Sequence, residues 1–159
     1  MPPQPIVDLT KYNLESIKYT ADDIRKIIPH RGAMALIDAV VEIDEAKGVA
    51  IGYKDARADE FWAPGHFPGN PLLPGVVMIE AAGQLAVFFY KVCFPEVANH
   101  LVVFGGVDHV RFRGSVRPGE RVWLVTRKVE MNRRIAKCEA QAFSSGKLVF
   151  EGTVIGIPV

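Results

Sequence analysis

Cysteine is scarce in this sequence: the 159 residues contain only two, Cys93 and Cys138. Two isolated cysteines do not build the disulfide framework of a small secreted protein, and no Cys-X-X-Cys pair indicates a zinc site. The N-terminus also lacks the basic, apolar and small-residue order of a secretory signal peptide. We therefore expect two reduced thiols in a cytoplasmic protein.

A large net charge is missing as well, because the formal net charge is +1 at pH 7. Charge is nevertheless unevenly distributed along the chain. Residues 1–65 carry eight Lys/Arg and eleven Asp/Glu, whereas residues 111–137 carry nine Lys/Arg and two Asp/Glu. Such clustering concerns partners rather than fold. Two interpretations stay open: exposed strand residues that keep the surface soluble, or a docking surface for an acidic partner.

Internal repeats and low-complexity linkers are absent, so we expect one domain over residues 1–159, with residues 1–20 as an N-terminal extension. Only residues 76–94 form a long apolar run. Its length would just span a bilayer, but Glu80, Gln84 and Lys91 interrupt it and no other segment resembles a span. We therefore interpret the run as a buried core helix and not as a membrane-inserted one.

The remaining patterns predict an α+β fold. Thr20 is placed to cap a short helix over residues 21–28, which Pro29 ends. Two β-rich runs, residues 35–42 and 48–54, predict a hairpin. One long helix followed by an antiparallel meander is typical of α+β rather than of alternating βαβ units. The stretches expected to form the meander are residues 100–105, 107–112, 121–131, 135–144 and 148–157.

A loop dense in proline and glycine precedes the long helix. Residues 63–75 contain four prolines and three glycines, and neither a helix nor a central strand tolerates that density. We therefore predict a stiff, non-repetitive loop. His66 lies inside it and has few conformations to lose, which suits a positioned general base. Taken alone, His66 also fits a plainer role as a loop histidine bonded to the backbone.

Glu80 lies on the second turn of the apolar helix. Apolar surroundings disfavour an ionised carboxylate, and a retained proton suits a general acid. Gln84 follows one turn later on the same face and is placed to orient Glu80. Taken alone, Glu80 also fits a pair with Lys or Arg, or an exposed helix start.

Gly75 stands where the helix begins. Helix N-termini offer unpaired backbone N–H groups and a partial positive charge, and a glycine lets a ligand carbonyl approach the backbone closely. One short stretch thus supplies a base, an acid and a carbonyl-polarising amide. These are the parts needed to take a proton from the carbon next to a thioester and to expel a β-hydroxyl.

These residues resemble the FabZ-type (3R)-hydroxyacyl-acyl-carrier-protein dehydratases. The match rests first on Gly65–Val76, a loop of the form Gly-His-Phe-Pro-Gly-Asn-Pro-Leu-Leu-Pro-Gly-Val, followed by Glu80 and Gln84. Further matching segments are Pro29-His30-Arg31, Leu36-Ile37-Asp38, Gly106–Arg113 and Pro118-Gly119-Glu120. The histidine loop with a carboxylate at this spacing is a highly specific signal.

The resemblance implies a hot-dog fold, in which a curled antiparallel sheet wraps a long central helix. It implies a homodimer, often assembled as a trimer of dimers, with His66 of one subunit facing Glu80 of the other. His66 and Glu80 would be catalytic, the backbone amide of Gly75 would bind the thioester carbonyl, and Gln84 and Phe67 would support them. The family uses no metal or redox cofactor.

The resemblance also implies the substrate, a 3-hydroxyacyl chain on the phosphopantetheine arm of an acidic acyl carrier protein. The basic stretch fits that partner, and no nucleic acid is expected. The arginines that we consider for carrier docking are Arg111, Arg113, Arg117 and Arg121. Glu80 favours simple dehydration, because relatives that also isomerise the double bond typically carry Asp there. Departures such as Gly32-Ala33-Met34, where the family commonly has an aromatic-proline step, bear on acyl-chain preference.

The expected reaction begins when neutral His66 removes the C2 proton, and protonated Glu80 then releases the C3 hydroxyl as water. This gives a trans-2-enoyl thioester, in fatty acid biosynthesis or a related acyl pathway. Phe88 and Phe89 are candidates for lining the acyl tunnel, although a plain core role fits equally. We interpret His30 as ordering a turn, with a supporting role at the site left open. Two alternatives remain: a hot-dog thioesterase that uses Glu80 to activate water, and a non-catalytic module that binds acyl chains or the carrier.

Overall fold

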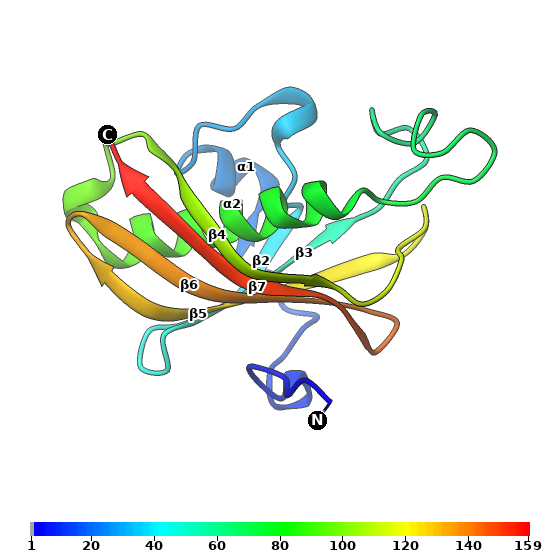
Figure 1. The fold of residues 1–159 in the computed structure, drawn as a ribbon. Helices are drawn as coiled ribbons and strands as arrows, with labels where there is room; N and C mark the ends of the chain where they lie inside the picture. Colours follow the sequence, from blue (N-terminus) through cyan, green and yellow to red (C-terminus); the bar gives the residue numbers. More distant parts are fainter. Residues whose placement is uncertain (1) are drawn as a thin grey trace.

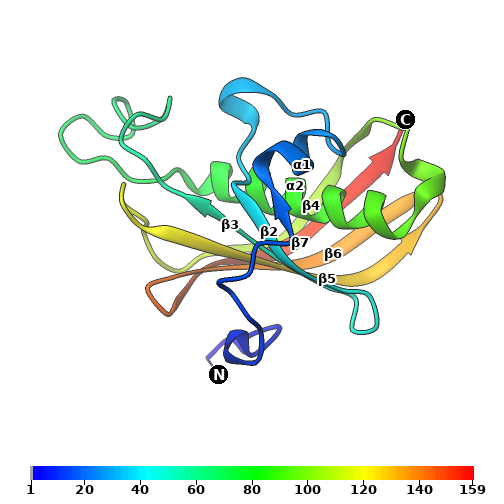
Figure 2. The ribbon, with the colours of Figure 1, turned by 180° about the vertical axis from the view of Figure 1, so that it is seen from behind.

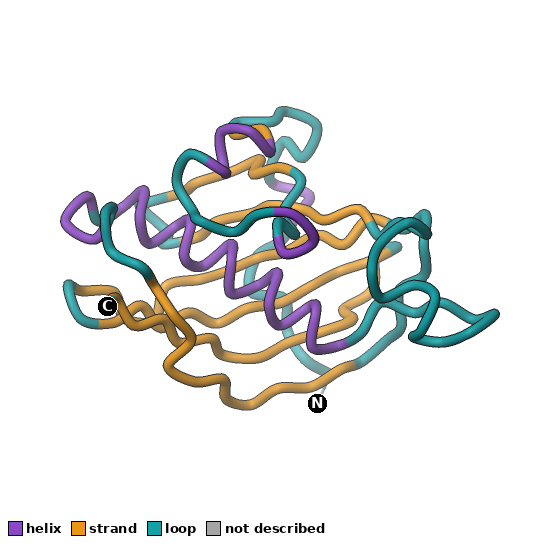
Figure 3. Tube along the Cα trace, turned by 90° about the horizontal axis from the view of Figure 1, so that it is seen from above, coloured by secondary structure: helices purple, strands orange, loops and turns teal. Residues whose placement is uncertain are grey.

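The computed structural model describes residues 2–159, in which one long helix lies across a seven-stranded antiparallel sheet. Figures 1 and 3 show the helix α2 (Gly75–Cys93) running diagonally over the concave face of the sheet. This is the hot-dog arrangement expected from the sequence, and the sheet is open. The strands are β1 (Tyr19–Thr20), β2 (Ala39–Asp44), β3 (Val49–Asp55), β4 (Val102–Phe112), β5 (Arg121–Asn132), β6 (Ile135–Ser144) and β7 (Lys147–Pro158), in the order β1-β2-β3-β5-β6-β7-β4.

The shorter helices lie around α2. The helix α1 (Ala21–Arg25) has Thr20 as its N-cap and a capping box with Asp23, as its sequence indicates. It ends three residues earlier than predicted, because the residue before Pro29 is biased away from helical geometry and the last turn loosens. The 3-10 turns are η1 (Leu9–Lys11), η2 (Gly32–Met34) and η3 (Pro95–Val97).

The main core lies between α2 and the concave face. The helix is long and apolar enough to cross a membrane by length and composition, but most of its surface is buried in the core of this fold. Phe88 and Phe89 are both fully buried there. Alternation along β2 separates the two faces, since Val40 belongs to the main core whereas Ala39 and Val41 point to the convex face.

The meander prediction was partly wrong. Strands β5, β6 and β7 follow one another as a meander, but β4 pairs with β7 at the far edge and not with β5. The stretches predicted as two strands, residues 100–105 and 107–112, form the single strand β4. A register shift between Phe104 and Gly106 lets the pairing with β7 continue past the two glycines.

The N-terminal segment, residues 2–18, crosses the convex face of the sheet (Figures 1 and 2). Its apolar side chains pack on a second cluster that β2, β3 and β5 contribute. Gln141 on β6 fixes it through two hydrogen bonds, because the Ile6 N–H donates to Oε1 at 2.7 Å and Nε2 donates to the Gln4 carbonyl at 2.9 Å. The packing residues of the segment are Ile6, Val7, Leu9, Tyr12 and Leu14.

Candidate active site

His66 lies in the loop between β3 and α2, which projects from one end of the sheet (Figures 1 and 2). Its Nδ1 lies 2.7 Å from the Leu72 carbonyl oxygen. Since a carbonyl oxygen only accepts, Nδ1 carries the proton of the neutral ring, and Nε2 keeps a free lone pair. The ring is half-buried and stacks on Phe67 at a centroid distance of 4.1 Å, across a cis peptide bond. His66 is therefore held in the tautomer that a general base needs.

A buried ion pair anchors the first limb of this loop. Lys54 Nζ lies 2.5 Å from Glu60 Oε2, and both side chains are almost fully buried. Trp62 Nε1 donates to the same oxygen at 3.1 Å, and the Arg57 N–H donates to Oε1 at 2.9 Å. Every oxygen of Glu60 is thus satisfied, and the entry to the loop has a fixed path.

The second limb is fixed by the connection between β4 and β5. The Leu73 N–H donates to the Val116 carbonyl at 2.8 Å, and Arg117 Nη1 donates to Asn70 Oδ1 at 2.6 Å. Asn70 in turn exchanges two backbone hydrogen bonds with Phe67. Asn70 thus ties the histidine loop to an arginine that is distant in the sequence.

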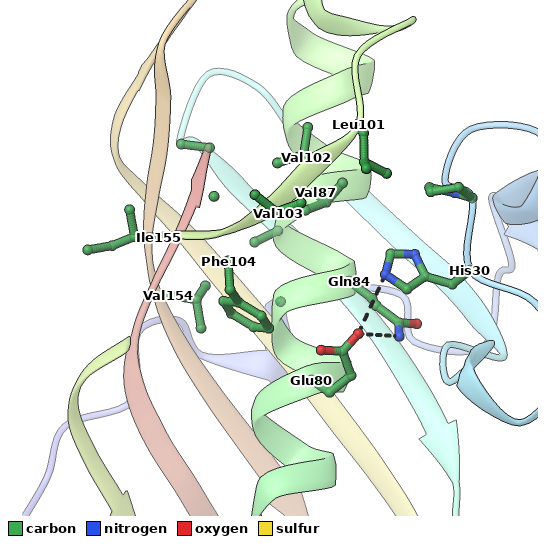
Figure 4. Close-up of a pocket in the computed structure, with 15 residues that line it drawn as sticks. His30, Glu80, Gln84, Val87, Leu101, Val102, Val103, Phe104, Val154 and Ile155 are labelled. Carbon is green, nitrogen blue, oxygen red and sulfur yellow. Dashed lines mark hydrogen bonds and ion pairs between the residues drawn. The ribbon is translucent and has the colours of Figure 1, made fainter. Parts of the chain in front are cut away.

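Glu80 lies on α2 with its side chain 24% exposed. Gln84 Nε2 donates to Glu80 Oε1 at 2.9 Å, so the contact expected from their spacing is present (Figure 4). Gln84 itself is 1% exposed, and its carboxamide is locked at both ends. The Leu36 N–H donates to its Oε1 at 3.1 Å, and its Nε2 donates to the Met34 carbonyl at 2.7 Å. The amide nitrogen must therefore face Glu80.

His30 is a residue of this site that sequence analysis assigned to a turn. Its Nε2 lies 3.5 Å from Glu80 Oε1, the same oxygen that Gln84 contacts (Figure 4). The signal that pointed here was the match of Pro29-His30-Arg31 to a family signature. The local pattern gave no partner for the ring, because Glu80 is fifty residues away in the chain.

Glu80, Gln84 and His30 supply the polar groups of an otherwise apolar cavity of about 260 Å³. Phe104 lies against the opening beside Glu80 in Figure 4. Phe88 and Phe89, candidates for a tunnel wall, are not among the lining residues and belong to the core. The apolar lining comes from α2, β4, β6, β7 and the residue before β4: Ala86, Val87, Leu101, Val102, Val103, Phe104, Ala136, Val154 and Ile155.

Gly75 is the first residue of α2, and no side chain caps this helix end. A Cβ at Gly75 would lie 2.6 Å from Phe112 Cε1 on β4, so any larger residue there would displace that half-exposed ring. From the sequence, this glycine was expected to let a ligand carbonyl approach the backbone. The contact with Phe112 gives a further reason for a glycine at this position, within one chain.

The structure does not bring His66 and Glu80 together within one protomer. In residues 2–159 no hydrogen bond or ion pair joins them, and His66 is absent from the cavity that Glu80 lines. The described residues also hold no group of three His, Cys, Asp or Glu side chains suited to a metal ion.

The four candidate docking arginines lie at the end of the sheet that carries the histidine loop, but they differ in pairing. Two of them are neutralised by carboxylates, and Arg121 also stacks on Tyr53 at 3.7 Å from the ring centroid. The contacts are Arg113 with Glu151 at 2.5 Å, Arg121 with Asp55 at 2.7 Å, Arg117 with Asn70 at 2.6 Å, and Arg111 with the Val110 carbonyl at 2.8 Å. Arg111 and Arg117 thus have no carboxylate partner among the ion pairs of residues 2–159.

The model of the FabA-like domain family matches residues 28–153. A protein named 3-hydroxyacyl-acyl-carrier-protein dehydratase FabZ from Herpetosiphon aurantiacus is 39% identical over 134 residues, which cover 84% of this chain and 93% of that relative. A relative of the same name from Moorella thermoacetica is 38% identical, over 83% of this chain and 91% of its own length.

Among solved structures, the dehydratase heterocomplex ApeI:P from Xenorhabdus doucetiae superposes with a TM-score of 0.73. The likeness covers 86% of this chain and 90% of that one, at 17% sequence identity, and at that identity it shows the fold alone. The family match and the two sequence relatives also show the family, because each extends over more than two thirds of the chain. This chain belongs to the FabA-like family and, within it, to the FabZ-type dehydratases.

Proposed function

We propose that the protein dehydrates 3-hydroxyacyl chains carried on acyl carrier protein, with His66 as base and Glu80 as acid, in cytoplasmic fatty acid biosynthesis. The observation that carries this proposal is the setting of Glu80. Its carboxyl stands at an apolar cavity with one oxygen bonded by Gln84 and facing His30, while the other has no hydrogen-bond partner in residues 2–159. A protonated carboxyl in that setting can hand its proton to a hydroxyl bound in the cavity.

The proposal requires a homodimer, and the free edge of β4 supports one. One side of β4 pairs with β7, and the other side forms the sheet edge. This edge is eleven residues long and exposes large apolar side chains, which favours pairing with another strand. A second copy on this edge would bring the partner's histidine loop toward Glu80. The exposed apolar residues are Val103, Phe104, Val107 and Phe112 on β4, with Val76 beside them on α2.

In the proposed reaction, Nε2 of the partner's His66 takes the C2 proton. The electron pair of that C–H bond forms the C2–C3 double bond through an enolate-like state, whose oxygen the backbone N–H of Gly75 stabilises. Glu80 gives its proton to the C3 hydroxyl, the C3–O bond breaks, and water leaves. The product is a trans-2-enoyl thioester. His66 then releases the C2 proton to solvent and Glu80 takes one up from solvent, which restores the neutral base and the protonated acid.

The same surface accommodates the two ends of the substrate. The apolar cavity takes the acyl tail beyond Glu80, because its lining residues offer no polar partner along that path. Arg111 and Arg117 are the docking residues that we favour for the acidic carrier, since Arg113 and Arg121 already have carboxylate partners. We expect charge reversal at Arg111 to raise KM for carrier-bound substrate more than for a coenzyme A thioester.

Subunit complementation tests the shared site. His66→Ala and Glu80→Gln variants should each be inactive as homodimers. When the two chains are mixed and allowed to exchange, each heterodimer has one interface site with both native residues and one with neither. Random exchange should therefore restore about a quarter of the native rate, since half of the dimers are mixed and one of their two sites is intact.

The readout is the absorbance of the enoyl thioester that forms. A Val129→Ala chain, which is altered at an exposed site on β5, is carried through the same mixing and exchange as the control. If mixing restores nothing although exchange is complete, His66 and Glu80 do not act across the interface. If the native chain releases free thiol from acyl thioesters and forms no enoyl product, it is a thioesterase, and the proposed dehydration is wrong.

A further inference from the structure

His30 is held in place by the residue that follows it. Arg31 Nη1 donates to the carbonyls of Ile28 and His30, at 2.9 and 2.8 Å, and its Nη2 donates to the Arg25 carbonyl at 2.7 Å. One guanidinium group thus joins three backbone carbonyls at the end of α1 and in the turn that leads to η2. The backbone at His30 consequently has a fixed path, and the His30 side chain is 22% exposed.

The two ring nitrogens of His30 have different surroundings. Nε2 faces Glu80 Oε1 at 3.5 Å, whereas Nδ1 is buried without a hydrogen-bond partner in residues 2–159. A neutral imidazole carries one N–H and one bare nitrogen. Because an orphaned buried N–H is the rarer and costlier of the two, the bare nitrogen belongs at Nδ1 and the N–H at Nε2.

The ring is neutral near pH 7, because burial lowers the pKa of His30 below its ordinary value. Arg31 and Lys91 lower that pKa further, and Glu80 opposes them. These are the charged groups that act on the imidazole. A neutral ring with its proton on Nε2 presents an N–H to the Glu80 carboxyl across the N···O distance of 3.5 Å.

We propose that His30 is a positioning residue that, together with Gln84, decides which oxygen of Glu80 transfers the proton. Gln84 Nε2 donates to Oε1 and His30 Nε2 lies 3.5 Å from the same oxygen, so the transferable proton belongs on Oε2, the oxygen left for the substrate hydroxyl. When that proton leaves with the departing water, negative charge develops on the carboxylate, and the Nε2–H of His30 is already directed at it. Such preorganised donors act where charge develops and need no rearrangement during the reaction.

This inference rests on the proposed function, in which Glu80 is the acid. An alternative is that the His30 ring only fills space, since it also lines the cavity. The two roles predict that different substitutions are tolerated. The positioning role depends on the N–H at Nε2, whereas the space-filling role depends on the shape of the ring.

Two variants separate these roles. His30→Phe keeps a planar ring and removes the donor, whereas His30→Gln loses the ring and keeps an N–H at the reach of Nε2. For His30→Phe we expect kcat to fall at least about tenfold with KM changed less than about threefold, because a transition-state donor is lost. His30→Gln should retain most of the native kcat. A native kcat in His30→Phe, or an equal loss in both folded variants, would overturn the inference.

A measurement on the unaltered protein gives a second test. Nitrogen-15 NMR of labelled histidine distinguishes the two neutral tautomers, and we expect the proton of His30 on Nε2. A proton on Nδ1 would contradict the inference even if every variant failed to fold. Native and Glu80→Gln chains are assayed alongside. If the native chain does not dehydrate, the proposed function has failed, whereas an active native chain with an unaffected His30→Phe variant refutes only the role of His30.

Discussion

At the scale of single residues, the site depends on the direction of hydrogen bonds. Leu72 fixes the proton of His66 on Nδ1, and Leu36 with Met34 fixes the orientation of the Gln84 amide. In both cases a backbone group, which cannot change its donor or acceptor role, sets the state of a side chain. The proposed base and the partner of the proposed acid are therefore oriented in the structure without any bound substrate.

The shifted pKa of His30 makes stability depend on pH. In the folded chain burial lowers this pKa, with Arg31 and Lys91 adding to the effect and Glu80 opposing it. In the unfolded chain His30 titrates near 6.5, so below that pH the unfolded state binds more protons. The free energy of unfolding should therefore fall as the pH is lowered through this range. The full contribution of His30 is present above the unfolded pKa.

His30→Phe removes that titration. Urea unfolding at about pH 7.5, 6.5 and 5.5 should show a shallower loss of unfolding free energy in the variant than in the native chain. His100, an exposed histidine, provides the matched control as His100→Phe. Equal slopes in all three proteins would mean that the His30 proton contributes nothing to stability.

Much of this site could be predicted from residue types and short spacings in the sequence. The proline-rich loop predicts a fixed His66, and the i,i+4 spacing predicts the contact between Glu80 and Gln84, which the structure contains. His30 was missed as a partner of Glu80, because their contact arises only when the turn after α1 folds onto α2. The roles of His66, Glu80 and Gly75 stay predictions until the variants are measured.

At the scale of elements, the N-terminal segment explains how an apolar convex face exists in a free-standing sheet. Ala39, Val41 and Ile51 point away from α2, and they would be exposed without the cover that residues 2–18 provide. The family match begins at residue 28. The segment thus lies outside the matched region and yet completes a hydrophobic cluster.

A charge on the inner side of the N-terminal segment should detach it from the convex face of the sheet. In Leu9→Asp, an ionised side chain would have to stay against the apolar cluster, so the segment should detach and the melting temperature should fall by several degrees. Lys11→Asp changes an exposed neighbour and should melt like the native chain. Differential scanning fluorimetry compares the three. A Leu9→Asp protein as stable as the native one would show that the segment adds nothing to the fold.

Element boundaries were predictable where local chemistry sets them. The Thr20 cap and the long helix were both expected, and both are present. Strand β4 was predicted in error as two strands, residues 100–105 and 107–112. Here pairing with β7 continues past the glycines through a bulge. Strand order needs contacts between distant residues, which no short pattern contains.

At the scale of the whole molecule, the two edges of the sheet differ. One edge is the two-residue strand β1, and the other is the eleven-residue strand β4 with its exposed apolar side chains. Only β4 is long enough to pair extensively with a second copy. The homodimer and the single-domain organisation of the chain both remain predictions, as does a trimer of dimers.

Val107→Glu tests the β4 edge. Two glutamates brought close together in an antiparallel pair of β4 strands would repel each other and lose apolar contact, so the dimer should dissociate. Light scattering should give half the native mass, and dehydration should be lost with it. Val129→Glu alters another exposed valine, on the interior strand β5, and should leave mass and rate unchanged. A dimeric Val107→Glu protein would place the interface elsewhere.

The positions of the two chain ends have a practical consequence for fusion proteins. The N-terminal end lies under the convex face, away from α2 and the cavity (Figure 1). By contrast, Val159 donates its N–H to the Leu101 carbonyl at 2.7 Å, and Leu101 lines the cavity. A purification tag or surface linker joined after Val159 would emerge beside this cavity, whereas one joined at the N-terminus would leave it clear. Immobilised enzyme should therefore keep more of its turnover when it is tethered through the N-terminus.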